Sequence, residues 1–192
     1  MATPDVIRDV GTTLLFLLRR SLPAAMVDPT RITVATPDEF QNLQRPQRPA
    51  VTLFLYRLGV ASEVRNSPRR MVAGGRSTRP LLPLELHYLI TPWAAQTTDE
   101  HRILGRILQI FYDHGEVGPA ELQGDSWAAG DSAQVVLEAL SIEDHYRIWD
   151  STNLPYRLSL TYMVRVIGIE PAEVVSAAPV LEGRFQGPED AP

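Results

Sequence analysis

Residues 156–166 alternate between apolar and polar side chains over about eleven positions, and this pattern constrains the fold more than any other stretch. The even positions are apolar or aromatic and the odd ones are mostly polar: Tyr156, Leu158, Leu160, Tyr162, Val164 and Val166 against Arg157, Ser159, Thr161, Met163 and Arg165. A period of two describes one long β-strand with a core face and a polar face. Because such a strand exceeds the usual length of about five or six residues, we expect it to be central to its sheet or to project beyond it.

Further strands and helices are expected along the rest of the chain. The patterns predict strands at 32–35, 51–58, 84–90 and 135–140, a turn at Thr36-Pro37-Asp38, and a short helix capped by Ser141. Strand 51–58 is apolar on both faces, which is typical of a strand in the interior of a sheet. The clustered strands with interspersed helices predict an α+β fold, a single domain with a mixed or antiparallel sheet flanked by helices.

Two longer helices are expected. The first begins at Thr3-Pro4-Asp5, with a capping hydroxyl and a proline at the first helical position. Its second half is apolar nearly all round, so it either packs in the core or also meets a neighbouring subunit. The second helix begins at Thr98-Asp99-Glu100 and ends before Gly115. Its expected inward residues are Ile103, Leu104, Ile107, Leu108 and Phe111.

The formal charge of −5 is concentrated at the C-terminal end of the 192-residue chain. From residue 170 onward there are five acids and one base, a net −4: Glu170, Glu173, Glu182, Glu189 and Asp190 against Arg184. The remainder carries −1, which argues against a nucleic-acid binder, whose affinity needs a concentrated basic surface. We expect residues 1–171 to form the domain and residues 172–192, rich in Ala, Pro, Glu and Gly, to form a flexible tail or arm.

Residues 61–80 hold five arginines against one acid, Glu63, with Gly74-Gly75 in the middle. The arginines are Arg65, Arg69, Arg70, Arg76 and Arg79. Two interpretations stay open. The segment is a solvated surface loop or hairpin tip, or it is an arm that docks on an acidic surface of a partner.

The sequence contains no strong catalytic or metal-binding pattern. There is no cysteine, and the four histidines, His87, His101, His114 and His145, lack the spacing of a helical metal site. Gly124-Asp125-Ser126 and Gly130-Asp131-Ser132 resemble the start of a serine-esterase block, but their loop-like surroundings favour turns. We expect no enzyme, no cofactor and no metal. A small hydrolase that uses Ser126 or Ser132 with His145 remains a distant alternative.

The longest apolar run, Leu14 to Leu18, is far shorter than the roughly 18–20 residues that span a bilayer. The acidic first residues do not form a secretory signal. We therefore expect no direct membrane insertion and expect synthesis in the cytoplasm. On this interpretation the protein leaves the cell only inside a larger particle or by lysis.

Several short motifs, taken in order, resemble one family. They are the Asp5-Val6-Ile7 helix start, the strand Pro49-Ala50-Val51-Thr52-Leu53-Phe54-Leu55-Tyr56, then Leu140-Ser141-Ile142-Glu143-Asp144, Trp149, Leu154-Pro155-Tyr156 and Val164-Arg165-Val166. Their order and spacing, over roughly residues 3–171, are similar to those of the tail terminator, or tube cap, of extracellular contractile injection systems. These are phage-tail-like particles such as antifeeding prophages and virulence cassettes.

The resemblance implies a phage tail-terminator-like fold and a structural role. A member would form a six-fold ring on the distal end of the inner tube and sheath and stop their polymerisation. Its partners would be further copies of itself, the sheath protein and the inner-tube protein. An adaptor or baseplate component of the same particle is the alternative. Because aromatic residues near arginines are typical of interface hot spots, the expected interface residues are Trp149, Tyr156, Arg157 and Arg165, with the five arginines of 61–80.

Overall fold

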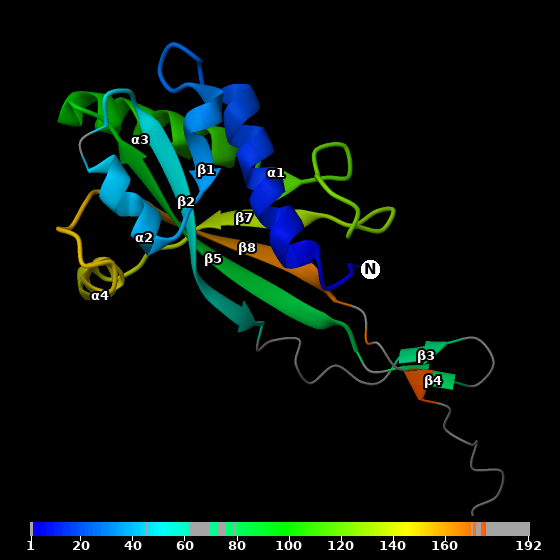
Figure 1. Cartoon of the computed structure of the whole chain (residues 1–192). Coiled ribbons are helices and arrows are strands. Elements are labelled where there is room, and N and C mark those ends of the chain that lie inside the picture. The colour runs from blue at the N-terminus through cyan, green and yellow to red at the C-terminus, as the bar shows by residue number, and fades with distance from the viewer. Residues whose placement is uncertain are drawn as a thin grey trace, which may run out of the picture.

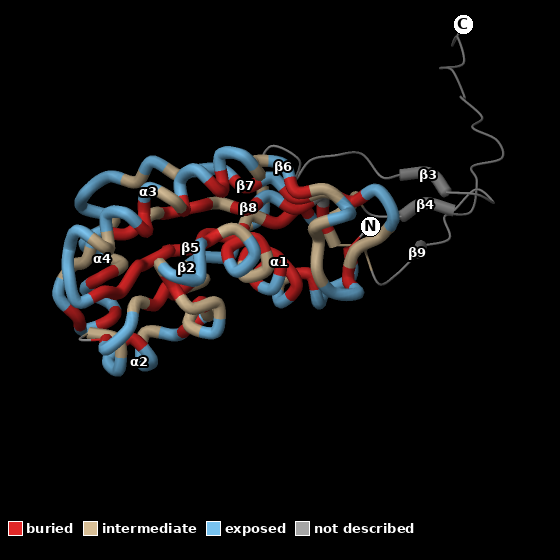
Figure 2. Tube along the Cα trace, turned by 90° about the horizontal axis from the view of Figure 1, so that it is seen from above, coloured by how far each residue is buried: buried red, intermediate tan, exposed pale blue. Residues whose placement is uncertain are grey.

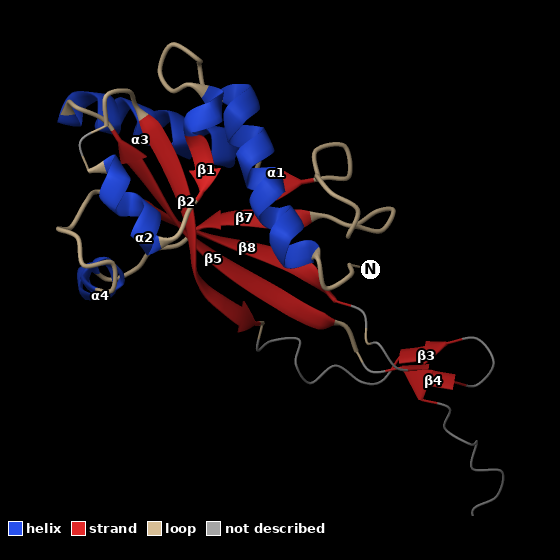
Figure 3. Cartoon of the chain, in the orientation of Figure 1, coloured by secondary structure: helices blue, strands red, loops and turns tan. Residues whose placement is uncertain are grey.

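The computed structural model describes residues 2–44, 46–61, 70–72, 76–78, 80–169, 171 and 174–175. Within them the chain forms a six-stranded sheet, a smaller three-stranded sheet and four α-helices (Figures 1 and 3). The helices are α1 (Val6–Ser21), α2 (Pro37–Phe40), α3 (Thr97–Asp113) and α4 (Ile142–Asp150). Short 3₁₀ turns lie at Pro29–Arg31 and Gln41–Leu43. The fold is α+β, as predicted.

The larger sheet has the order β1-β2-β5-β8-β7-β6. Its strands are β1 (Ile32–Val34), β2 (Ala50–Val60), β5 (Leu82–Trp93), β6 (Glu116–Val117), β7 (Ala133–Leu137) and β8 (Leu160–Ile169). β1 runs parallel to β2 and every other pairing is antiparallel, so the sheet is mixed. β2 lies between β1 and β5, which confirms the predicted interior position, although β1 pairs only with Val51–Leu53.

β8 is the long strand expected from the alternating pattern, and it lies between β5 and β7 in the interior of the sheet. Tyr162, Val164 and Val166 are buried, as predicted. The predicted start at residue 156 is wrong, because β8 begins at Leu160, and Leu158 is 50% exposed. Just before β8 the guanidinium of Arg157 binds Glu100 of α3 and the hydroxyl of Ser159 accepts from Trp149 of α4, and these side-chain contacts hold the stretch against the two helices.

Two hydrophobic cores lie on opposite faces of the larger sheet. Alternate residues of β5 supply them: Leu84, Leu86, Tyr88 and Ile90 enter the larger core, and Leu89 and Trp93 enter the smaller one. The larger core contains α1 and α3, and the smaller one contains Phe40 of α2 and Trp149 of α4. Figure 2 shows the buried residues running along the strands and the inner sides of the helices.

Several helix predictions need correction. α1 begins at Val6 and not at Pro4, because the backbone amide of Thr3 is bound to the carbonyl of Ser126 at 2.9 Å. The predicted turn at 36–38 is the start of α2, where the carboxylate of Glu39 accepts a hydrogen bond from the amide of Thr36 at 2.7 Å. α4 agrees with the prediction, since the amide of Asp144 donates to the hydroxyl of Ser141 at 3.1 Å.

The smaller sheet has the order β3-β4-β9, and its β3 and β4 come from the arginine-rich segment. β3 (Arg70–Val72) and β4 (Arg76–Thr78) form an antiparallel pair, and β9 (Val174–Val175) pairs with β4. In Figure 1 β3 and β4 stand apart from the helices and the larger sheet. The predicted domain boundary between residues 171 and 172 stays a prediction, and residues 176–192 lie outside the described residues.

Candidate functional site

Arg157 is partly buried and is held in place by three contacts. Its Nη1 lies 2.5 Å from Oε1 of Glu100, and its Nη2 donates to the carbonyl of Gln44 at 2.9 Å. The guanidinium carbon lies 4.8 Å from the centre of the Trp93 ring, in a cation–π contact. Arg157, Glu100 and Gln44 border a hollow of about 640 Å³ that also reaches His101 and Leu158. Arg157 therefore shapes a surface hollow and does not project from it.

Trp149 is fully buried, and its indole Nε1 donates to the hydroxyl of Ser159 at 3.2 Å. Tyr156 lies over it, and stacks on Tyr146 with 4.6 Å between ring centres. Trp149 thus supports the surface that Tyr146 and Tyr156 form, and its own side chain is not part of that surface. Sequence reasoning missed Tyr146 and Ile142, which are exposed and four residues apart on one side of α4.

Arg165 lies far from Arg157 along the sheet. It is opposite Glu85 of β5, and its Nε lies 3.2 Å from Oε1 of that residue. Arg157 instead covers Trp93, eight residues further along β5, which corresponds to about 26 Å at roughly 3.3 Å per residue. The structure therefore brings Trp149, Tyr156 and Arg157 together and leaves Arg165 apart from them.

The expected arginine cluster is described only in part. Arg70 and Arg76 open β3 and β4. Arg65, Arg69 and Arg79 lie outside the described residues. The cluster's proposed role at an interface stays a prediction.

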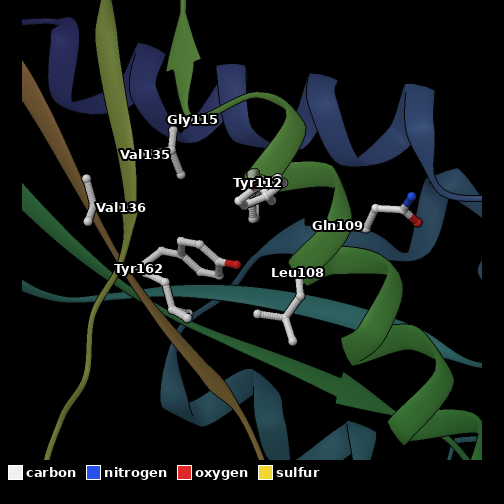
Figure 4. A pocket seen from close by; sticks show the side chains of 9 residues that line it. Leu108, Gln109, Tyr112, Gly115, Val135, Val136 and Tyr162 are labelled. Atoms are coloured by element: carbon white, nitrogen blue, oxygen red, sulfur yellow. The ribbon is translucent and has the colours of Figure 1, made fainter.

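A second hollow, here called the α3–β7 groove, lies between α3 and β7 and has a volume of about 500 Å³. Its lining is mainly apolar: Leu108, Gln109, Phe111, Tyr112, Gly115, Val135, Val136, Leu137 and Tyr162. Figure 4 shows side chains of α3 on one side and those of β7 and β8 on the other. Leu108 is 37% exposed and Tyr112 is 88% exposed. The prediction that Leu108 faces inward is therefore wrong, because β7, the neighbouring strand, ends at Leu137.

Glu138 joins three segments through its carboxylate. Its Oε2 accepts a hydrogen bond from the hydroxyl of Tyr56 at 2.8 Å and lies 2.9 Å from Nδ1 of His87. Burial, followed by the hydrogen bond to Glu138, raises the pKa of Tyr56 well above its ordinary value. The neutral phenol is thus the form that this arrangement binds.

The two Gly-Asp-Ser triplets have structural surroundings. Ser126 is buried, and its amide donates to Asp9; the carboxylate of Asp131 accepts from the amide of Ala128 at 2.9 Å and closes its own turn. In Figure 1 the 118–132 loop and α4, which carries His145, lie at different ends of the sheet. The structure does not bring the expected hydrolase residues together.

Metal sites and membrane-spanning helices are not found among the described residues. No group of three or more His, Asp or Glu side chains in this part of the chain has a metal-binding arrangement. None of its helices combines the length and the hydrophobicity that crossing a bilayer requires.

The chain was compared with protein families and with proteins of known structure. The family model described as the Pvc16 N-terminal domain matches residues 9–182. One similar cryo-EM structure is the sheath/tube terminator of PVC, an extracellular contractile injection system, in its extended state. It is 24% identical with a TM-score of 0.63, and the match covers 100% of this chain and 66% of that chain.

Another is the anti-feeding prophage cap (AFP tube terminating cap), also solved by cryo-EM. It is 19% identical with a TM-score of 0.60, and the match covers 97% of this chain and 62% of that chain. This chain thus spans less than two thirds of the length of both solved proteins. No curated protein matches it significantly. The predicted tail-terminator-like fold is confirmed by these structures.

Proposed function

The chain belongs to the Pvc16 N-terminal domain family, and from that membership and its fold we propose that it is a structural terminator of a contractile injection particle. It caps the distal end of the inner tube and sheath and stops their polymerisation. The observation that carries the proposal is the family match over residues 9–182. The likeness to a sheath/tube terminator and to a tube terminating cap supports it at the level of fold.

The physical requirement on such a protein is a surface requirement. The growing end of a helical tube or sheath offers repeating heterologous surfaces to the next subunit. A terminator matches this surface on one face and offers no copy of it on the other. Several large apolar side chains among the described residues are exposed, which suits a protein that acts through its surface.

We further propose that six copies form a ring on the tube and sheath, and that the contacts to the particle come from two regions. One is the surface of Tyr156 beside Arg157 with Trp149 as its support, and the other is the small sheet with its arginine-rich segment. Arg165 on β8 and the tail after residue 171 are additional contact candidates. A short sheet such as β3-β4-β9 pairs readily with a strand of another chain, because no strand among the described residues lies beside the outer edge of β3.

The same proposal covers location and chemistry. The protein is synthesised and assembled in the cytoplasm and can leave the cell as part of a released particle. It acts through surfaces and not as an enzyme, since Ser126 is buried and held by Asp9. An adaptor or baseplate position in the same particle remains the alternative within this class.

Deleting the gene for this chain tests the cap. The expected result is particles whose tubes and sheaths vary in length, measured by electron microscopy, and restored length control when the wild-type chain is returned. Gold-labelled antibody should mark the distal tip. Deletion particles of normal length, or labelling at the baseplate, would contradict the cap.

The hydrolase alternative is tested with two serine variants. Ser126→Ala and Ser132→Ala chains should restore length control like the wild type. If either substitution abolished an ester-hydrolysing activity of the wild type, the hydrolase would be favoured.

A further inference from the structure

Within the described residues, the two opposite borders of the six-stranded sheet both expose apolar residues and strand edges without a neighbouring strand. At one border β1 pairs only with Val51–Leu53, so the outer edge of β2 from Leu55 to Val60 has no strand beside it in the part of the chain that the structure describes. Leu58 on this stretch is 49% exposed, and Val60 and the nearby Val34 of β1 are exposed too. We call this surface the β2 border.

At the other border β6 pairs only with Ala133 and Gln134 of β7. The next residues, Val136 and Leu137, are exposed and form one wall of the α3–β7 groove. The opposite wall belongs to α3, where Leu108 and Tyr112 lie one helical turn apart. An aromatic side chain as exposed as Tyr112, beside three exposed aliphatic ones, is typical of a surface that another protein covers.

The charges of the two surfaces are opposite. Arg57 is exposed on the β2 border. Asp113 and Glu116, which are also exposed, follow Tyr112 at the end of the groove. An arginine brought from the first surface to the second would therefore meet carboxylates, which favours this pairing over a contact of either surface with itself.

We propose that the β2 border of one copy packs into the α3–β7 groove of the next copy. This inference rests on the proposed ring and names the contact that builds it. Because the two surfaces lie at opposite edges of one sheet, the contact is heterologous, and each copy keeps one surface of each kind for its two neighbours. When the rotation from each copy to the next adds up to a full circle, the copies form a closed ring in which every β2 border and every groove is occupied.

Charged substitutions test the contact. Leu58→Glu disables the β2 border and Tyr112→Glu disables the groove. Ala24→Glu, at an exposed position after α1 and outside both surfaces and the Tyr156 surface, is the control. Assembly is measured by analytical ultracentrifugation, alone and on tube and sheath protein. Leu58→Glu and Tyr112→Glu should each be monomeric, and Ala24→Glu should assemble like the wild type. An equimolar mixture of the two monomeric variants should form dimers and nothing larger, because only one intact pair of surfaces remains.

The contact would be overturned if both variants assembled like the wild type, if either variant formed dimers with itself, or if the mixture stayed monomeric. If circular dichroism shows that a variant does not fold, cross-linking tests the contact instead. The wild-type sequence contains no cysteine, so it gives no background reaction with a maleimide. A Leu58→Cys, Leu137→Cys chain treated with a short bis-maleimide should give a ladder of oligomers, and a Leu58→Cys, Ile142→Cys chain should not. The absence of the ladder while the wild type forms rings would overturn this contact and leave the cap standing. A wild type that never assembles, even on tube and sheath, would overturn the ring itself.

Discussion

The carboxylate of Asp9 in α1 accepts a hydrogen bond from the backbone amide of Ser126 at 3.1 Å, across 117 residues of sequence. Asp9 is buried, and Nε of Arg8 donates to its other oxygen at 2.8 Å. A second tie lies close by, where the amide of Gln123 donates to the hydroxyl of Thr13 at 2.9 Å. Together they fix the 118–132 loop to the first helix.

Asp9→Asn should lower the free energy of unfolding by about 1–3 kcal/mol, because it replaces a charge-assisted hydrogen bond in a buried place with a weaker one. Urea unfolding at neutral pH measures this. Asp5→Asn, at an exposed position on the same stretch, is the control and should change stability by less than about 0.5 kcal/mol. Equal effects of the two substitutions would show that the contact to Ser126 contributes nothing.

The same carboxylate predicts a pH dependence. Burial alone would raise the pKa of Asp9, but the hydrogen bonds from Arg8 and Ser126 outweigh burial and hold the pKa below its ordinary value. The folded state therefore favours the ionised form. Its contribution is present above the unfolded pKa of about 3.9 and is lost as the pH falls through the lower folded pKa. In the same urea measurement, the free energy of unfolding of the wild type should fall more than that of Asp9→Asn as the pH is lowered from 5.

Gly124 and Gly130 form a matched pair for substitution. Both have a positive φ, +95° and +87°, where a side chain is strained. A Cβ at Gly124 would lie 2.2 Å from the carboxylate carbon of Asp9, whereas nothing lies within 4 Å of one at Gly130. Gly130→Ala should cost about 1 kcal/mol and Gly124→Ala at least about 2 kcal/mol more, since the tie to α1 must break. Thermal unfolding measures both, and similar costs would contradict the close approach.

Arg157→Lys tests whether the planar guanidinium is needed. A lysine keeps the charge beside Glu100 but loses the second donor to Gln44 and the contact with the Trp93 ring. We expect a loss of about 1–2 kcal/mol in urea unfolding. Arg165→Lys is the control, because the side chain of Arg165 is 44% exposed and its pair with Glu85 should contribute less than about 0.5 kcal/mol. If Arg157→Lys lowered the free energy of unfolding no more than Arg165→Lys, the three-contact arrangement would be contradicted.

Glu138→Ala should cost about 2–3 kcal/mol, because it leaves the hydroxyl of Tyr56 and the ring of His87 without their shared acceptor. Tyr56→Phe removes one donor and should cost about 1 kcal/mol. In the double variant the two losses should not add, since the Tyr56 bond is already absent. Additive losses in a double-mutant cycle would show that the residues act independently.

The sequence by itself determined the elements whose signals are local. The alternation through Tyr162, Val164 and Val166 specified one face of β8, and the apolar run from Val51 specified an interior strand. Ser141 at the start of α4 was readable because an N-cap acts within one turn. Trp149, Tyr156 and Arg157, which the sequence grouped as interface candidates, do lie together, and their role at an interface stays a prediction.

Only the tertiary structure decided where these patterns stop and which side chains stay at the surface. β8 begins at Leu160 because Arg157 binds Glu100 and covers Trp93, partners that lie more than fifty residues away. Leu108 has the spacing of a core residue, yet it is exposed because the neighbouring strand ends at Leu137. Local spacing records which face of an element is apolar. Whether that face is covered depends on how far the next element extends, and this is set by contacts between residues distant in the chain.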